Sequence, residues 1–191
     1  CIPSKTILHT AGVITQVQEI ANHCVTYSKP TIDLKKLINW KENVVGKLTH
    51  GLSGLAKRRK IDIVTGIGKF VTPNQLIVTN NNKKTAIHFQ KAIIAAGSQA
   101  VRPTSFPNDK RLMDSTDALA LTSIPERLLI IGGGIIGLEM ATVYAALGSR
   151  ITVVELLDTL MPGCDRDLVQ PLRTRLAARF EGLFLGTKVP A

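Results

Sequence analysis

The stretch RLLIIGGGIIGLEMATVYAALGSRITVVE, residues 127–155, decides the fold class of this chain. It begins with a short apolar run at Leu128–Ile131 and ends with a second one at Ile151–Val154. Between them lie three consecutive glycines and a helical pattern that Gly148 ends. Short apolar runs separated by a helix are typical of buried parallel strands. The stretch therefore predicts a β-strand, α-helix, β-strand unit.

The glycines of this stretch have the spacing of a dinucleotide-binding loop. Gly132, Gly134 and Gly137 form G-x-G-x-x-G directly after the first strand and at the start of the helix. The first glycine permits a tight turn, the second lets the backbone approach a pyrophosphate, and the third lets helix and strand pack closely. The helix N-terminus would present free N–H groups to the phosphates. A glycine turn without a ligand is the alternative.

Two acidic residues accompany the loop. Glu155 ends the second strand, 23 residues after Gly132, where a carboxylate can accept hydrogen bonds from ribose hydroxyls. Leu156 and Leu157 follow it instead of a cation, which favours NAD(H) over NADP(H), although an exposed strand-end glutamate would look the same. Glu139 lies in the first turns of the helix, where it either stabilises the helix dipole or faces the reactive end of a cofactor.

The rest of the chain predicts further α/β elements. We expect a helix near residues 167–180 and a short strand at residues 183–189, which would complete a βαβαβ unit. Pro171 implies that this helix begins there or is kinked. The remaining predicted elements are helices at residues 3–23 and 34–59, an antiparallel ribbon from Ile61 with a turn at residues 80–84, a buried parallel strand at residues 92–98, and a connection between two units at residues 100–125.

Composition excludes several classes of protein. The chain has 191 residues and no apolar run of 18 or more, so we expect a soluble, cytoplasmic protein. Its three cysteines are too few and too far apart for a disulfide framework or a zinc site. The net charge of +10 lies in residues 1–125, with 17 Lys and Arg against 7 Asp and Glu, and two Tyr and one Trp offer little base stacking. A nucleic-acid-binding module is therefore disfavoured.

The first five residues, CIPSK, place a cysteine before a helix. Pro3 suits the first helical turn, and a thiolate at Cys1 would be stabilised by the helix dipole and by Lys5. From the residues alone, an incidental surface thiol is an equal alternative. The four histidines have no metal-binding or triad spacing.

Several motifs in one register resemble dihydrolipoyl dehydrogenases, class I members of the pyridine nucleotide-disulphide oxidoreductases. These motifs are CIPSK, GIGKF, AIIAAGS, DSTDAL and PERLLIIGGGIIGLEMATVYAALG followed by VVE, and they span essentially the whole chain. The resemblance implies an α/β fold of Rossmann-like FAD- and NAD(P)-binding units with parallel sheets, a three-layer architecture and a small antiparallel β-ribbon. It implies that residues 1–125 are the remainder of an FAD-binding domain and residues 126–191 the N-terminal part of an NAD-binding domain.

The resemblance also implies roles for individual residues. Cys1 matches the flavin-side cysteine of a redox-active disulfide, whose partner would lie five residues earlier, and Lys5 matches a lysine near the flavin. The residues that match FAD contacts are Gly68, Ala96, Gly97 and Ser98. The residues that match the NAD pyrophosphate loop are Gly132, Gly133, Gly134, Ile135, Ile136, Gly137, Leu138 and Glu139, with Glu139 close to the nicotinamide and Glu155 as the ribose-binding acid. No residue is expected to bind a metal.

The implied function is oxidation of protein-bound dihydrolipoamide by NAD⁺ through a redox disulfide and FAD. Implied partners are lipoyl domains of 2-oxo acid dehydrogenase or glycine cleavage complexes, and a second copy in a homodimer. Because the first glycine-rich unit, the second cysteine and the C-terminal catalytic pair are absent from this sequence, we expect an internal fragment that is inactive alone and holds FAD poorly. The alternatives are a non-catalytic NAD-binding fragment, a soluble pyridine nucleotide transhydrogenase and a mercuric reductase.

Overall fold

The computed structural model describes residues 1–102 and 105–189 and divides the chain into two compact units. One unit combines Cys1–Val45 with Ala100–Ala191, and the other consists of Gly46–Gln99. The predicted connection at residues 100–125 includes residues 103 and 104, and the predicted NAD-binding domain includes residues 190 and 191. Those four residues lie outside the described ones. The predicted domain boundary at residue 125 stays a prediction.

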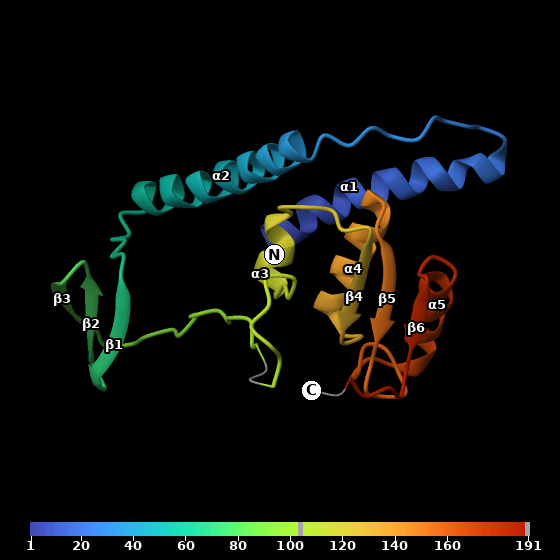
Figure 1. Cartoon of the computed structure of the whole chain (residues 1–191). Helices are drawn as coiled ribbons and strands as arrows, with labels where there is room; N and C mark the ends of the chain where they lie inside the picture. Colours follow the sequence, from blue (N-terminus) through green and yellow to red (C-terminus); the bar gives the residue numbers. More distant parts are fainter. Residues whose placement is uncertain (103–104, 190–191) are drawn as a thin grey trace. The chain divides into compact units, whose positions relative to one another are not determined.

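The first unit is built on a parallel sheet of three strands in the order β4-β5-β6 (Figure 1). Helix α4 connects β4 to β5, and helix α5 lies between β5 and β6 in the chain, as the βαβαβ pattern predicts. The bounds are β4 (Arg127–Ile131), α4 (Ile135–Leu147), β5 (Arg150–Val154), α5 (Arg166–Ala177) and β6 (Gly182–Phe184). The α/β class with a parallel sheet is thus confirmed.

The core of this unit lies between one face of the sheet and the helices. Ile151 and Val153 of β5 are buried together with Tyr144 of α4 and Leu176 of α5. Leu128 and Ile130 of β4 pair with Ile151 and Val153. Because successive strand residues point to opposite faces, Leu129 and Ile131 lie on the face of the sheet away from this core. There Leu129 is 52% exposed. Among the described residues, helices therefore bury one face of this sheet.

Helix α1 (Ile2–Glu19) packs against α4 in the same unit and continues into a short 3₁₀ turn, η1 (Ile20–His23). Its side chains Ile7 and Ala11 are almost completely buried. Pro3 lies in its first turn, where a missing N–H costs no intrahelical hydrogen bond. The predicted helix at residues 3–23 is confirmed, with a 3₁₀ turn as its last four residues.

Helix α3 (Ser115–Ala120) is held at both ends by side chains. At its start, Asp114 accepts hydrogen bonds from the N–H groups of Thr116 and Asp117 in a capping box. At its end, the Tyr144 hydroxyl donates to the Ala118 carbonyl at 3.0 Å. The buried Lys41 of α2 (Leu34–Arg58) donates to the Leu119 carbonyl at 2.6 Å. The Leu119 carbonyl of the last turn thereby gains a partner, and the Ala118 carbonyl, which also accepts from the Leu121 N–H at 3.3 Å, gains a second one.

The second unit contains an antiparallel ribbon in the order β1-β2-β3, which confirms the predicted ribbon. Its strands are β1 (Ile67–Thr72), β2 (Gln75–Asn80) and β3 (Lys83–His88). The turn between β2 and β3 has positive φ angles at Asn81 (45°) and Asn82 (66°). Asparagine tolerates this conformation, which two-residue hairpin turns require.

The predicted buried strand at residues 92–98 is wrong. These residues have no regular secondary structure, and Ile93 is 96% exposed. A parallel strand needs neighbouring strands for its backbone hydrogen bonds, and among the described residues no strand pairs with this segment. The segment is apolar, as predicted, but none of the described strands pairs with it, and it therefore does not form a strand.

Pro171 does not start α5, which begins at Arg166. The proline lies inside the helix, where its ring removes one backbone N–H.

None of the helices in the described part of the chain is both long and apolar enough to cross a membrane.

The chain provides a matched pair of tyrosines for testing the contact between α3 and α4. Tyr144 is fully buried, and burial raises the pKa of its hydroxyl, which therefore stays protonated and donates to Ala118. We expect Tyr144→Phe to lower the free energy of unfolding by about 1 kcal/mol, because the Ala118 carbonyl loses a buried hydrogen bond and keeps only the Leu121 N–H at 3.3 Å. Tyr27 is 65% exposed. Tyr27→Phe should leave the free energy of unfolding, measured by urea denaturation, unchanged. Equal losses of stability in the two variants would contradict the prediction.

Candidate nucleotide-binding site

The glycine loop connects β4 to α4 with a backbone shape that glycine alone adopts freely. Gly132 has a φ of 108°, in a region that side chains disfavour. Its N–H donates to the Val154 carbonyl at 2.8 Å, so the loop starts directly against the end of β5. The turn therefore lies at the carboxyl ends of two parallel strands, the edge of such sheets where ligands bind.

The other two fingerprint glycines meet different surroundings. A Cβ on Gly137 would lie 2.4 Å from the Gly132 carbonyl oxygen, so α4 can begin this close to the loop only without a side chain there. A Cβ on Gly134, the N-cap of α4, would meet no heavy atom within 4 Å. The side of the loop at Gly134 is open, and the first-turn N–H groups of α4 give it positive character. This geometry fits a bound pyrophosphate.

Glu155 points inward and binds the loop. Its side chain is 8% exposed, and its two carboxylate oxygens accept hydrogen bonds from the N–H groups of Gly133 at 2.5 Å and Leu157 at 2.8 Å. The alternative of an exposed strand-end glutamate is therefore wrong. The carboxylate ties the end of β5 to the glycine loop and places a negative charge beside it.

The segment that follows β5 packs against the glycine loop at Gly133, and the sequence patterns did not reveal this contact. Leu160 is fully buried, and a Cβ on Gly133 would lie 2.6 Å from its side chain. The Met161 N–H donates to the Gly133 carbonyl at 2.9 Å. In the sequence, this contact is indicated only weakly, by the apolar pair Leu160 and Met161 just before Pro162 and Gly163.

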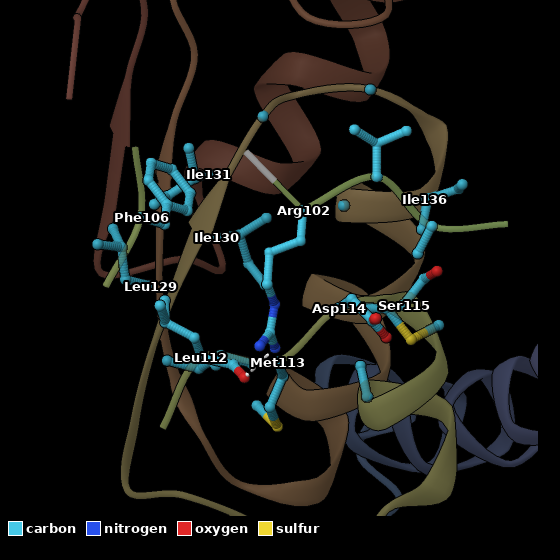
Figure 2. Close-up of a pocket in the computed structure, with 18 of the residues that line it drawn as sticks. Arg102, Phe106, Leu112, Met113, Asp114, Ser115, Leu129, Ile130, Ile131 and Ile136 are labelled. Carbon is cyan, nitrogen blue, oxygen red and sulfur yellow. Dashed lines mark hydrogen bonds between the residues drawn. The ribbon is translucent and has the colours of Figure 1, made fainter. Parts of the chain in front are cut away.

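A pocket of about 630 Å³ lies beside the loop, on the side of β4 away from β5 (Figure 2). Three fingerprint glycines line it, together with Ile135, Ile136 and residues 128–131 of β4. Its other wall comes from the chain before and at the start of α3. The pocket is therefore mostly apolar and open to the N-terminus of α4.

That second wall contains three charged residues that the sequence patterns did not reveal, Arg102, Arg111 and Asp114. Arg102 donates to the Leu112 carbonyl at 2.9 Å and lies 3.6 Å from the Asp117 carboxylate. The backbone N–H of Asp117 is the main cause that lowers the pKa of Asp114, and Arg102 adds a smaller effect. The sequence DSTD at residues 114–117 carries a capping-box signal that would have identified Asp114.

The structure brings Lys5 and Glu139 together from motifs 134 residues apart. Lys5 forms an ion pair with the Glu139 carboxylate, and the lysine is the more exposed partner, at 62% against 17%. Cys1, one helical turn before Lys5, is the N-cap of α1 and is exposed. The cysteine end of α1 therefore lies against the first turns of α4.

The other predicted site residues are distributed differently. Gly68, Ala96, Gly97 and Ser98 belong to the second unit and are exposed, with Gly97 at a φ of 74°. They do not by themselves enclose a flavin. Leu138 is buried in the core and its backbone N–H donates to the Gly134 carbonyl at 3.0 Å, whereas Ile135 and Ile136 are more than half exposed.

Comparisons of sequence identify the relatives of this chain. A family model of pyridine nucleotide-disulphide oxidoreductases matches residues 1–183. The dihydrolipoyl dehydrogenases of Vibrio parahaemolyticus and Vibrio cholerae are 47% and 48% identical over 192 residues. Each alignment covers 100% of this chain and 40% of the relative. The chain thus spans about 40% of the length of the curated relatives it matches.

Solved structures with the same fold include a flavoprotein disulfide reductase and LpdA. The HOCl-induced flavoprotein disulfide reductase RclA from Escherichia coli is 30% identical, with a TM-score of 0.78 over 99% of this chain and 40% of its own. LpdA from Mycobacterium tuberculosis is 21% identical, with a TM-score of 0.85 over 100% of this chain and 42% of its own, which supports the fold alone.

Two fingerprint glycines form a matched pair for a stability test. We expect Gly137→Ala to lower the free energy of unfolding by about 3 kcal/mol or more, because its methyl group would collide with backbone. Gly134→Ala enters open space and should cost under about 1 kcal/mol. Thermal and urea unfolding of both variants check this expectation, which equal stabilities would refute.

Proposed function

The chain belongs to the pyridine nucleotide-disulphide oxidoreductase family, and from this premise we propose that it forms the NAD(H)-binding part of a dihydrolipoyl dehydrogenase and carries its flavin-side thiol. The observation that carries the proposal is the Lys5–Glu139 ion pair, because it joins the cysteine end of α1 to the helix that begins at the glycine loop. The activity is that of the longer protein, an NAD-dependent enzyme that oxidises dihydrolipoyl groups.

The nucleotide is proposed to bind across the loop with its pyrophosphate at Gly134. The N–H groups of the first turn of α4 donate to the phosphate oxygens, and the helix dipole favours their negative charge. The adenosine ribose would lie near the end of β5, where each Glu155 oxygen already accepts one N–H and has a further lone pair for a ribose hydroxyl. A 2′-phosphate there would meet that negative charge, and Leu156 and Leu157 offer no compensating cation. NAD(H) is therefore the proposed nucleotide.

The nicotinamide half is proposed to extend along the start of α4 toward Glu139. Ile135 and Ile136 present exposed apolar surface on this path. Lys5 holds the Glu139 carboxylate in place and partly neutralises it, so the uncharged ring of NADH can approach without an isolated charge beside it, and the remaining negative charge favours the cationic ring of NAD⁺.

Cys1 is proposed to act as the thiolate on the flavin side. It stands at the N-terminus of α1, whose positive end stabilises a thiolate, and Lys5 adds a second positive charge one turn away. Bound FAD would supply the two-electron chemistry between the thiols and NAD⁺. The residues matched to FAD contacts do not by themselves enclose a flavin among the described residues. The proposed partners are lipoyl domains of 2-oxo acid dehydrogenase or glycine cleavage complexes and a second copy of the enzyme.

A narrower function, NAD(H) binding without thiol chemistry, is the second candidate. It is favoured by the location of the pyrophosphate loop, Glu155 and Glu139 within one unit, whereas Gly68 and residues 96–98 belong to the other. Under this reading the chain binds the nucleotide, but Cys1 takes no part in electron transfer.

Titration of the chain with NADH by calorimetry tests the nucleotide site. We expect Glu155→Gln to weaken NADH binding about tenfold or more, because the amide is a weaker partner for two N–H groups and for ribose. Cys1→Ser should leave the affinity unchanged, and NADPH should bind more weakly than NADH.

Glu126→Gln is the matched control, because this exposed glutamate precedes β4 at the opposite end of the sheet. Equal losses in Glu155→Gln and Glu126→Gln, or no NADH binding by the unmodified chain, would overturn the proposed site. The narrower function would be favoured if the chain binds NADH and if, in a reconstituted longer enzyme, the Cys1 thiol takes no part in electron transfer.

A further inference from the structure

We propose that Arg175 and Arg179 are positioning residues that fix helix α1 along its own axis and so determine where Cys1 and Lys5 stand against Glu139. The contact between α1 and the end of α5 is here called the arginine ladder, and it consists of the pairs Arg179–Thr15 and Arg175–Glu19. Its importance for electron transfer rests on the proposed function, whereas its effect on geometry does not.

The two pairs of the ladder are spaced alike on both segments. Arg179 donates to the Thr15 hydroxyl at 2.8 Å, and Arg175 donates to the Glu19 carboxylate at 3.0 Å. Thr15 and Glu19 are four residues apart on α1, and the two arginines are four residues apart at and just beyond the end of α5. The pairs run in opposite sequence order, so the segments are antiparallel at this contact. Four residues correspond to about one helical turn.

Burial differs between the two pairs. Thr15 is 5% exposed and Arg179 is half-buried, so the inner pair is partly shielded from water. The outer pair is exposed, at 61% for Arg175 and 49% for Glu19. Exposed ion pairs contribute little on their own. The inner pair therefore supplies most of the constraint, and the outer pair restricts rotation about it.

Without the ladder, the axial position of α1 is weakly determined. The most buried α1 side chains facing α4 are Ile7 and the small Ala11, and α4 presents Ala141 in the same core. Apolar packing is non-directional, and small side chains allow one helix to shift along another. At the other end, Lys5 is largely exposed, and a flexible lysine follows its carboxylate through small displacements.

The ladder acts at a distance through the helix. Thr15 is ten residues from Lys5, which is about 15 Å along an α-helix. A helix transmits an axial shift along its length, and a shift of one turn is about 5.4 Å. Such a shift would break both pairs of the ladder and carry Lys5 away from Glu139. The ladder therefore sets the position of the cysteine end from the opposite end of α1.

Zero-length crosslinking measures this position directly in the whole chain. A water-soluble carbodiimide activates the Glu139 carboxylate, the Lys5 amine attacks it, and an amide forms while the carbodiimide takes up the oxygen and leaves as a urea. Mass spectrometry of the digest gives the Lys5–Glu139 product relative to the local Lys36–Asp33 product, whose partners are 3.2 Å apart. This ratio cancels differences in reagent and digestion.

We expect Arg175→Ala combined with Arg179→Ala to lower the ratio at least about fivefold. Arg173→Ala, on the same helix and outside the ladder, should leave it within about twofold. Thr15→Val, which removes the acceptor with little change in shape, should act in the same direction as the double variant. Arg179→Lys keeps a cation in reach of Thr15 and should recover part of the signal.

An unchanged ratio in both Thr15→Val and the double variant would overturn the proposal. If circular dichroism shows that the double variant does not fold, Thr15→Val alone decides. The crosslinking needs no nucleotide, so a chain that fails to bind NADH but shows the expected ratios refutes the proposed function and supports the ladder. If the chain binds NADH as expected and the ratio of the two crosslinked products is the same in all variants, the proposed role of the ladder is refuted and the proposed function is not.

Discussion

The close approach of α4 to the glycine loop is the constraint on which the rest of the first unit depends. Gly137 leaves no room for a side chain, since a Cβ there would lie 2.4 Å from the Gly132 carbonyl oxygen. This approach places the N-terminus of α4 at the carboxyl end of β4, and it brings Gly133 within hydrogen-bond distance of Glu155. The same helix then provides the surface on which α1 packs.

The packing of α1 on α4 joins two kinds of chemistry in one compact unit. One end of α1 carries Cys1 and Lys5, and α4 carries the loop and Glu139. Because these residues share one unit, the spacing between the thiol and the proposed nucleotide site depends on contacts of α1 within that unit. The polar contacts at the far end of α1 contribute to that spacing without touching either site.

The second unit illustrates what a segment needs besides the right residues. The ribbon β1-β2-β3 is complete because each strand finds its partner within a few residues. Residues 92–98 are also mostly apolar, yet they stay exposed and have no regular secondary structure, and no described strand pairs with them.

By itself, the sequence determined the elements that rest on local chemistry: the strand, glycine turn and helix around Gly132, the hairpin at Asn81 and the family to which the chain belongs. Periodicity and glycine spacing encode these features within a few residues. Only the tertiary structure decided that Glu155 turns inward, that Lys5 meets Glu139, and that α1 is held on α5. The physical reason is that these contacts join residues far apart in the chain, whose meeting depends on how completed helices and strands pack.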